Sequence, residues 1–151
     1  MKVSEFLTEE MVIPELRART KQEVLDEFSV FLGEQGQIPE PVALSDILAA
    51  RESLGSTGIG EGVAIPHGKM GGLTRMIIAF GRSGKGIDFD SLDGQPAKLF
   101  FLLVAPEDAP GEHLKALALI SRLMKNAKLR ESILKARDAK EIKVLITREE
   151  G

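Results

Sequence analysis

Apolar residues recur every three or four positions over much of the chain, which is the spacing of an amphipathic helix. This spacing covers residues 20–36, 41–53, 111–125, 126–136 and the stretch from 138 onward. Two Thr/Asp-x-x-Glu pairs, Thr20 with Glu23 and Asp138 with Glu141, form capping boxes that mark helix starts, and Asn126 can cap another. The pattern therefore predicts two helices early in the chain and three near its end.

Between these helical stretches the apolar residues run continuously. Such runs are typical of central strands that are covered on both faces. The predicted strands are residues 11–13, 63–65, 76–80 and 99–105, with a possible edge strand at 87–89. We therefore expect an α/β fold: a single domain over residues 1–151, with a mixed β-sheet of about five strands and helices packed on both faces.

Residues 51–69 follow neither spacing. They hold glycines at positions 55, 58, 60 and 62, with Ser56 and Thr57 between the first two. This composition favours a loop with positive φ angles that brings backbone N–H groups close to an anion. The short strand 63–65 follows and ends at Pro66, and His67 comes directly after it. Two hydroxyls, backbone amides and a histidine indicate a site for an anion and a nucleophile.

Arg51 stands in the last turn of the helix predicted over residues 41–53. It continues the apolar stripe of Leu44, Ile47 and Leu48. An arginine at such a position indicates an anionic partner. The alternative is that Arg51 caps the last carbonyls of its own helix.

Composition narrows the possible functions. The 151 residues suffice for one domain with a full core. The absence of cysteine excludes disulfides and cysteine catalysis, and it agrees with a cytoplasmic location. No apolar run reaches the roughly 20 residues of a membrane span, so we expect no membrane insertion. The net charge of −3 argues against nucleic-acid binding. Residues 51–86, however, hold five basic residues and two acidic ones, which suits a phosphorylated partner.

Three motifs carry a resemblance to a known family. Arg51–Glu52, Gly55–Gly60 and Ala64–Gly68 resemble the signature of enzyme IIA of the fructose, mannitol and nitrogen-regulatory type. The likeness continues through residues 86–96 and 101–106 to His113, and so covers essentially the whole chain. Enzymes IIA are phosphocarriers of the bacterial phosphoenolpyruvate-dependent phosphotransferase system.

The resemblance implies a phosphotransferase. His67 would accept a phosphoryl group on Nε2 from an HPr-type phosphocarrier and pass it to a IIB domain, while its other ring nitrogen is held by the backbone. Arg51 would neutralise phosphoryl charge, and His113 would lie beside His67. We expect Ser56 and Thr57 to bind phosphoryl oxygens. No cofactor or metal is implied, and contact with the membrane would be peripheral, through the transporter.

A second function within the family stays open. A nitrogen-regulatory IIA protein would use the same phosphohistidine chemistry, but its phosphorylation state would control binding to a regulatory target protein. The residues do not distinguish this function from sugar transport, and they do not name a sugar.

Other interpretations of the same residues fit less well. Gly62–Lys69 resembles a nucleotide-binding P-loop, but it is one residue too long and methionine follows the lysine. A metal hydrolase could use both histidines with Asp88 or Asp90, although no two of these share the short helical spacing of such sites. His113, on the apolar face at the start of its predicted helix, is also typical of a hydrogen-bonded core residue.

Overall fold

A mixed six-stranded sheet forms the centre of the computed structural model, which describes residues 1–151. The strands are β1 (Val12–Ile13), β2 (Gly58–Gly60), β3 (Val63–Ala64), β4 (His67–Met70), β5 (Ile77–Ile87) and β6 (Ala97–Pro106). Their order is β1-β5-β6-β3-β2, and β4 pairs with β6. The prediction of an α/β domain with a mixed sheet is confirmed.

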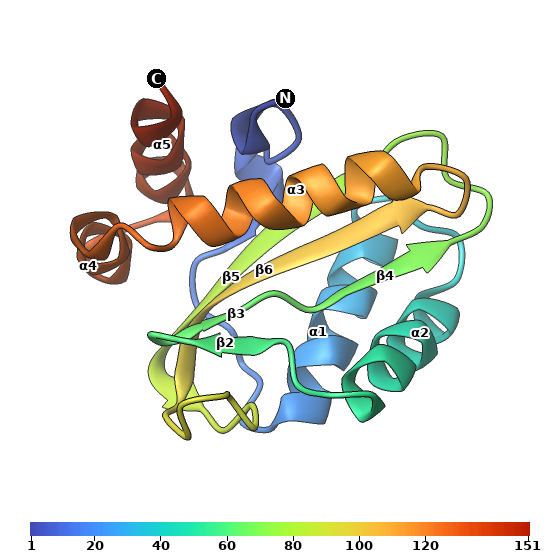
Figure 1. The fold of residues 1–151 in the computed structure, drawn as a ribbon, viewed down its shortest axis with the longest axis horizontal. Coiled ribbons are helices and arrows are strands. Elements are labelled where there is room, and N and C mark those ends of the chain that lie inside the picture. The colour runs from blue at the N-terminus through green and yellow to red at the C-terminus, as the bar shows by residue number, and fades with distance from the viewer.

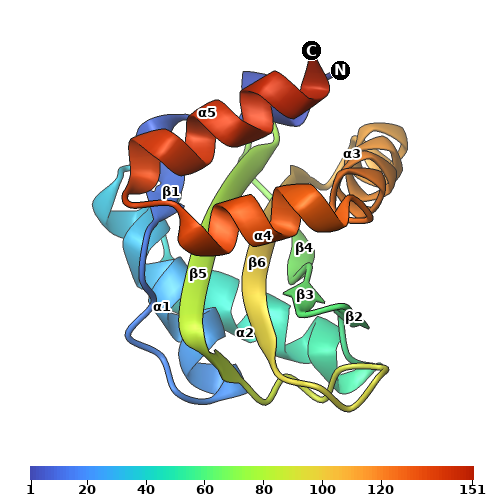
Figure 2. The ribbon, with the colours of Figure 1, turned by 90° about the vertical axis from the view of Figure 1, so that its left-hand side faces the viewer.

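Five α-helices surround the sheet. They are α1 (Lys21–Glu34), α2 (Pro41–Ser53), α3 (Pro110–Leu123), α4 (Ala127–Lys135) and α5 (Ala139–Glu150), and two short 3-10 helices, η1 (Val3–Glu5) and η2 (Glu9–Met11), precede β1. Helices α1 and α2 lie on one face of the sheet and α3, α4 and α5 on the other (Figures 1 and 2). None of these helices is long and apolar enough to cross a membrane.

The helix starts follow the predicted caps. The side chains of Thr20, Asn126 and Asp138 each accept the backbone N–H three residues further along, at 3.2, 3.1 and 2.9 Å. These bonds satisfy N–H groups that have no partner inside the helix. Helices α2 and α3 begin instead with Pro41 and Pro110, at a position where the missing N–H costs nothing.

The core lies between β5, β6 and the covering helices. Every residue of β6 except Lys98 is buried, as the continuous apolar run predicts for a central strand. Strand β6 pairs antiparallel with β5, and the rings of Phe80 and Phe101 meet across this pair with centroids 4.9 Å apart. One cluster of 39 buried residues includes both strands and the inner faces of the helices.

An interrupted strand borders β6 on its other side. Strands β3 and β4 both run parallel to β6, and they are separated by Ile65 and Pro66. The ladder cannot continue through Pro66, because proline has no N–H to donate. The carbonyl of Pro66 still accepts the N–H of Leu103 at 3.0 Å, so the chain stays against β6. His67 therefore begins β4 at a fixed place beside the middle of the sheet.

Three predicted details are wrong. The glycine stretch contains a short strand, β2 (Gly58–Gly60), which pairs irregularly with β3. Residues 67–70 form β4 rather than a loop. Residues 87–89 are not a separate edge strand, because β5 continues through its glycines and a shift in register to end at Ile87, paired with Ala97. In each case pairing with a neighbouring strand outweighs the local preference of glycine for turns.

Candidate functional site

A hollow of about 380 Å³ lies where helix α2 ends and where β4 and α3 begin. Its lining residues come from these three elements and from Leu54, which follows α2, and none of them is acidic. They are Ile47, Ala50, Arg51, Leu54, His67, Gly68, Lys69 and His113. The fold therefore brings Arg51, His67 and His113 together, although they are distant in the sequence.

The ring of His67 is held in one orientation by the break between β3 and β4. Its Nδ1 lies 2.8 Å from the carbonyl oxygen of Ile65. Because a carbonyl can only accept, Nδ1 carries the proton and Nε2 keeps its lone pair. The pKa of His67 is lowered, mainly by burial. The hydrogen bond to Ile65 raises this pKa, the charge of Arg51 lowers it further, and the charge of Glu52 raises it, but burial outweighs both raising causes. His67 is therefore neutral and nucleophilic near pH 7.

The second histidine faces the first. The ring centroids of His67 and His113 lie 5.3 Å apart with their planes at 77°, so the expectation that His113 lies beside His67 is confirmed. His113 is 6% exposed, and its Nδ1 has no hydrogen-bond partner in the protein. Burial, followed by the charges of His67 and Lys69, lowers the pKa of His113. A core histidine is normally hydrogen-bonded, so the core interpretation does not explain this residue.

Arg51 is hydrogen-bonded to the glycine loop and also lines the hollow. Its Nη1 donates to the carbonyl of Gly55 at 2.9 Å, which lies beyond the end of the helix rather than among its last carbonyls. The remaining N–H groups of its guanidinium have no partner in the protein, and no carboxylate lies within ion-pair distance. The guanidinium is therefore held by the loop and still has donors for an anion.

The structure does not bring the hydroxyls of Ser56 and Thr57 to the hollow. Ser56 Oγ donates to the carbonyl of Phe89 at 2.6 Å and accepts the N–H of Gly58 at 3.0 Å. Thr57 Oγ1 donates to the carboxylate of Glu52. Their assignment as phosphoryl ligands rested on residue type alone, and we replace it with a role in shaping the loop, because both hydroxyl protons are already donated within the protein.

Glu52 holds the glycine loop in place, a contact that the sequence reasoning did not identify. Its side chain is buried, accepts the N–H of Thr57 at 3.1 Å and pairs with Lys21 Nζ at 3.0 Å. Arg51 and Glu52 thus fasten the glycine loop to α2 from two adjacent positions. The sequence motif contains both Arg51 and Glu52. The hydrogen bonds between Glu52 and Thr57, however, form only in the folded loop, so the sequence does not show them.

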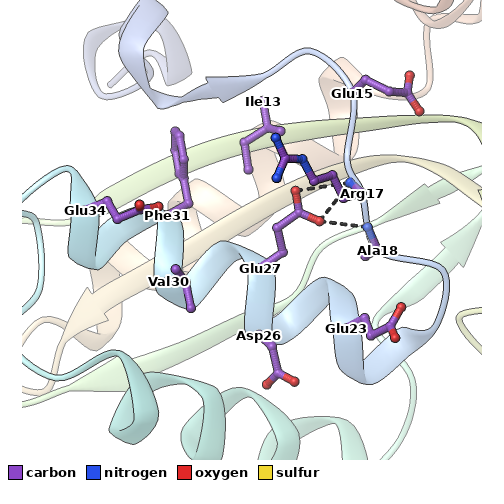
Figure 3. Close-up of a pocket in the computed structure, with 10 residues that line it drawn as sticks. All are labelled: Ile13, Glu15, Arg17, Ala18, Glu23, Asp26, Glu27, Val30, Phe31 and Glu34. Atoms are coloured by element: carbon purple, nitrogen blue, oxygen red, sulfur yellow. Dashed lines mark hydrogen bonds between the residues drawn. The ribbon is translucent and has the colours of Figure 1, made fainter.

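A larger hollow than the one around His67 lies elsewhere, beside α1 (Figure 3). This groove of about 720 Å³ is lined by ten residues, among them five carboxylates, and holds no nucleophile. Figure 3 shows one of these carboxylates, Glu27, accepting the backbone N–H groups of Arg17 and Ala18, at 2.9 and 2.8 Å. The groove is thus where the segment before α1 is attached to the helix. No group of three or more His, Cys, Asp or Glu side chains is arranged to hold a metal ion, so the metal-hydrolase interpretation gains no support.

Comparisons with known proteins identify the family of this chain. The chain is 41% identical over 143 residues to a nitrogen regulatory protein of Bradyrhizobium diazoefficiens, with 94% of this chain and 92% of that protein covered. It is also 41% identical over 136 residues to the PTS system fructose-specific EIIABC component of Bacillus subtilis, with 90% of this chain covered. The chain spans about a fifth of that protein's length, 21%.

Structural comparison gives the same grouping. The crystal structure of nitrogen regulatory protein IIA-Ntr from Neisseria meningitidis has a TM-score of 0.88 and 33% identity, covering 95% of this chain and 98% of that one. Residues 5–149 match the family model described as phosphoenolpyruvate-dependent sugar phosphotransferase system, EIIA 2. The chain therefore belongs to the EIIA 2 family of the phosphoenolpyruvate-dependent sugar phosphotransferase system.

Proposed function

We propose that this protein is a phosphocarrier that accepts a phosphoryl group on Nε2 of His67 and passes it to a partner protein. The observation that carries the proposal is the 2.8 Å contact between His67 Nδ1 and the Ile65 carbonyl. It directs the lone pair of a neutral imidazole to Nε2, in a hollow that contains Arg51 and no acidic residue.

The proposed step conserves atoms and charge. The lone pair of His67 Nε2 forms a P–N bond, the P–N bond of a phosphohistidine on an HPr-type donor breaks, and its electron pair returns to the donor's imidazole. Delivery to a IIB domain repeats the step with His67 as the leaving group. Arg51 and His113 stabilise the charge on the phosphoryl oxygens while it moves.

Relatives support a protein partner on each side of this step. A IIA protein for mannitol from Escherichia coli has been solved as a complex with phosphorylated IIB; it has a TM-score of 0.75 and 20% identity over 92% of this chain and 95% of that one. A multiphosphoryl transfer protein of Shigella flexneri is 31% identical over 118 residues, which are 78% of this chain and 14% of that protein. We propose an HPr-type donor and a fructose- or mannitol-type IIB acceptor, both met in the cytoplasm.

A nitrogen-regulatory function is the second candidate. It is favoured by the Bradyrhizobium relative, which matches over nearly its whole length at the same identity as the fructose protein. In this case His67 would be phosphorylated by the same chemistry, and the phosphorylation state would decide whether a regulatory target binds.

Phosphorylation with purified components tests the proposal. The protein is incubated with phosphoenolpyruvate, enzyme I and HPr, and incorporation is followed by mass spectrometry before and after acid treatment. We expect one acid-labile phosphoryl group, which His67→Ala abolishes. Undiminished labelling of His67→Ala would overturn the assignment. Addition of a fructose- or mannitol-type IIB domain then separates the two candidates, because only the transport function requires the label to leave for IIB.

A further inference from the structure

We propose that Lys69 is a second cationic ligand of the phosphoryl group carried by His67, acting together with Arg51. The inference rests on the proposed function, because it assigns a further residue to the same phosphohistidine. Lys69 would touch the phosphoryl oxygens directly and so set how strongly the protein holds the group.

The geometry of β4 directs Lys69 to the same side as His67. Successive side chains of a strand point to opposite faces, so positions 67 and 69 share one face. Burial along β4 follows this alternation: Gly68 and Met70 are buried, His67 is half-buried and Lys69 is exposed. Both His67 and Lys69 line the hollow with Arg51.

Close packing behind the strand fixes this face. A Cβ built on Gly68 would lie 2.6 Å from Cγ2 of Ile47, so α2 packs directly against the backbone of β4 at this point. The strand cannot rotate without driving its backbone into α2. His67 and Lys69 therefore keep their common direction toward the hollow.

Lys69 has no anionic partner of its own. No ion pair joins its ammonium to a carboxylate within 4.0 Å, and no hydrogen bond of its side chain is present. Its charge nevertheless reaches the second histidine, since it is one of the causes that lower the pKa of His113. The ammonium is thus near enough to His113 for its charge to act there, and it is free to bind an anion.

The charge of the phosphoryl oxygens favours a second cation beside Arg51. A phosphoryl group on a neutral imidazole brings a charge of roughly −1.5 to −2 at pH 7. Burial lowers the pKa of His113, so this imidazole stays neutral near pH 7 and adds no cation of its own. Arg51 offsets one negative charge, and Lys69 is the other cation in the lining of the hollow.

The test compares Lys69→Gln with Lys69→Arg and with Lys115→Gln. Lys115 is an exposed residue of α3 that does not line the hollow, so it controls for the general effect of positive charge near a docking partner. Each phosphoprotein is titrated by ³¹P NMR, and the equilibrium of phosphoryl exchange with HPr is measured from both directions. Thermal unfolding of each variant confirms that the fold is kept.

We expect Lys69→Gln to raise the pKa of the bound phosphoryl group and to shift the exchange equilibrium about two- to tenfold toward HPr. Lys69→Arg should restore both values, and Lys115→Gln should leave the phosphoryl pKa unchanged. If Lys69→Gln alters only the exchange rate and leaves the phosphoryl pKa and the equilibrium as in the wild type, Lys69 acts in docking and the inference is overturned. Failure of the wild type to take up phosphate at His67 would instead overturn the proposed function.

Discussion

The rings of His67 and His113 meet edge to face, with centroids 5.3 Å apart. The first residue begins β4 and the second lies in the first turn of α3, so the contact exists only when α3 is docked on the sheet. The N-terminal end of a helix carries partial positive charge, which disfavours protonation of His113 and favours an anion nearby. Two adjacent imidazoles also resist simultaneous protonation. The pair is therefore suited to accept a phosphoryl group rather than a proton.

Replacing His113 should separate acceptance of the phosphoryl group from its onward transfer. His113→Ala removes a hydrogen-bond donor from the transferred group but leaves the nucleophile, so the protein should still be labelled and should transfer about ten- to a hundredfold more slowly. Rapid-quench kinetics with HPr and with a IIB domain measure this. His113→Gln, which keeps a donor, should recover part of the rate. Normal transfer in both directions, with only a lower unfolding temperature, would make His113 a core residue.

Both imidazoles should titrate below the ordinary histidine pKa of about 6.5. Burial lowers both pKa values, and the charge of His67 is a further cause for His113. NMR titration of the ring C–H signals measures each value. In His67→Asn the pKa of His113 should rise part of the way toward its ordinary value, because the charge disappears but the burial remains. A value for His113 that does not change would contradict direct coupling of the two rings.

The same lowered pKa values predict how stability depends on pH. Below about pH 6.5 the unfolded chain binds protons at its histidines while the folded protein does not, so the free energy of unfolding should fall as the pH falls. The loss is complete once the pH is below the folded-state pKa values of His67 and His113. Denaturant titrations between pH 7.5 and 5 measure it. The double variant His67→Asn, His113→Asn should show a flatter curve over this range.

Much of the fold is predictable from the sequence because apolar spacing and helix caps are local. The caps at Thr20, Asn126 and Asp138 and the central strand β6 are all where these signals place them. Strand β4 is not predictable in this way, since its residues His67–Met70 are paired because β6 lies beside them. Local preference cannot report a partner that is distant in the sequence.

The candidate site, too, is only partly predictable from local sequence. His67 and Arg51 are recognisable from residue type and position, and both line the hollow. Ser56 and Thr57 carry suitable hydroxyls, but hydrogen bonds to Phe89 and Glu52 use them inside the loop. Only the folded loop shows which donors remain free, so residue type alone overestimates the number of hydroxyl donors available to an anion.

Arg51 should be sensitive to a change that preserves its charge. Arg51→Lys keeps the positive charge but loses the planar fork that can hold the Gly55 carbonyl and an anion together. Loss of charge-assisted hydrogen bonds of roughly 1.5–3 kcal/mol should slow transfer on the order of ten- to a hundredfold, and Arg51→Ala should be slower still. Arg137→Lys, at an exposed arginine that pairs with Glu141 and lies outside the hollow, is the matched control. Normal rates in both Arg51 variants, with reduced stability alone, would leave Arg51 as a loop anchor only.

Glu52 should act on transfer through the glycine loop, without contact with the phosphoryl group. Glu52→Gln removes the ion pair with Lys21. It also places an amide donor where Thr57 already supplies two donors, its N–H and its hydroxyl, so one of these bonds is lost. Together these changes should lower the free energy of unfolding by about 1–3 kcal/mol. Transfer should slow because Gly55, to which Arg51 is bonded, lies in the loosened segment.

A comparison of Thr57→Val with Glu52→Gln identifies the origin of both effects. Thr57→Val keeps the shape of the side chain and the backbone N–H bond to Glu52, and it removes only the hydroxyl bond. It should therefore lower stability less than Glu52→Gln and slow transfer less. In both variants the loss of transfer rate should increase with the loss of stability. Hydrogen exchange of the amides of residues 55–58 should quicken in the same order. If Glu52→Gln lost stability while loop exchange and transfer stayed as in the wild type, Glu52 would stabilise the fold without positioning Arg51.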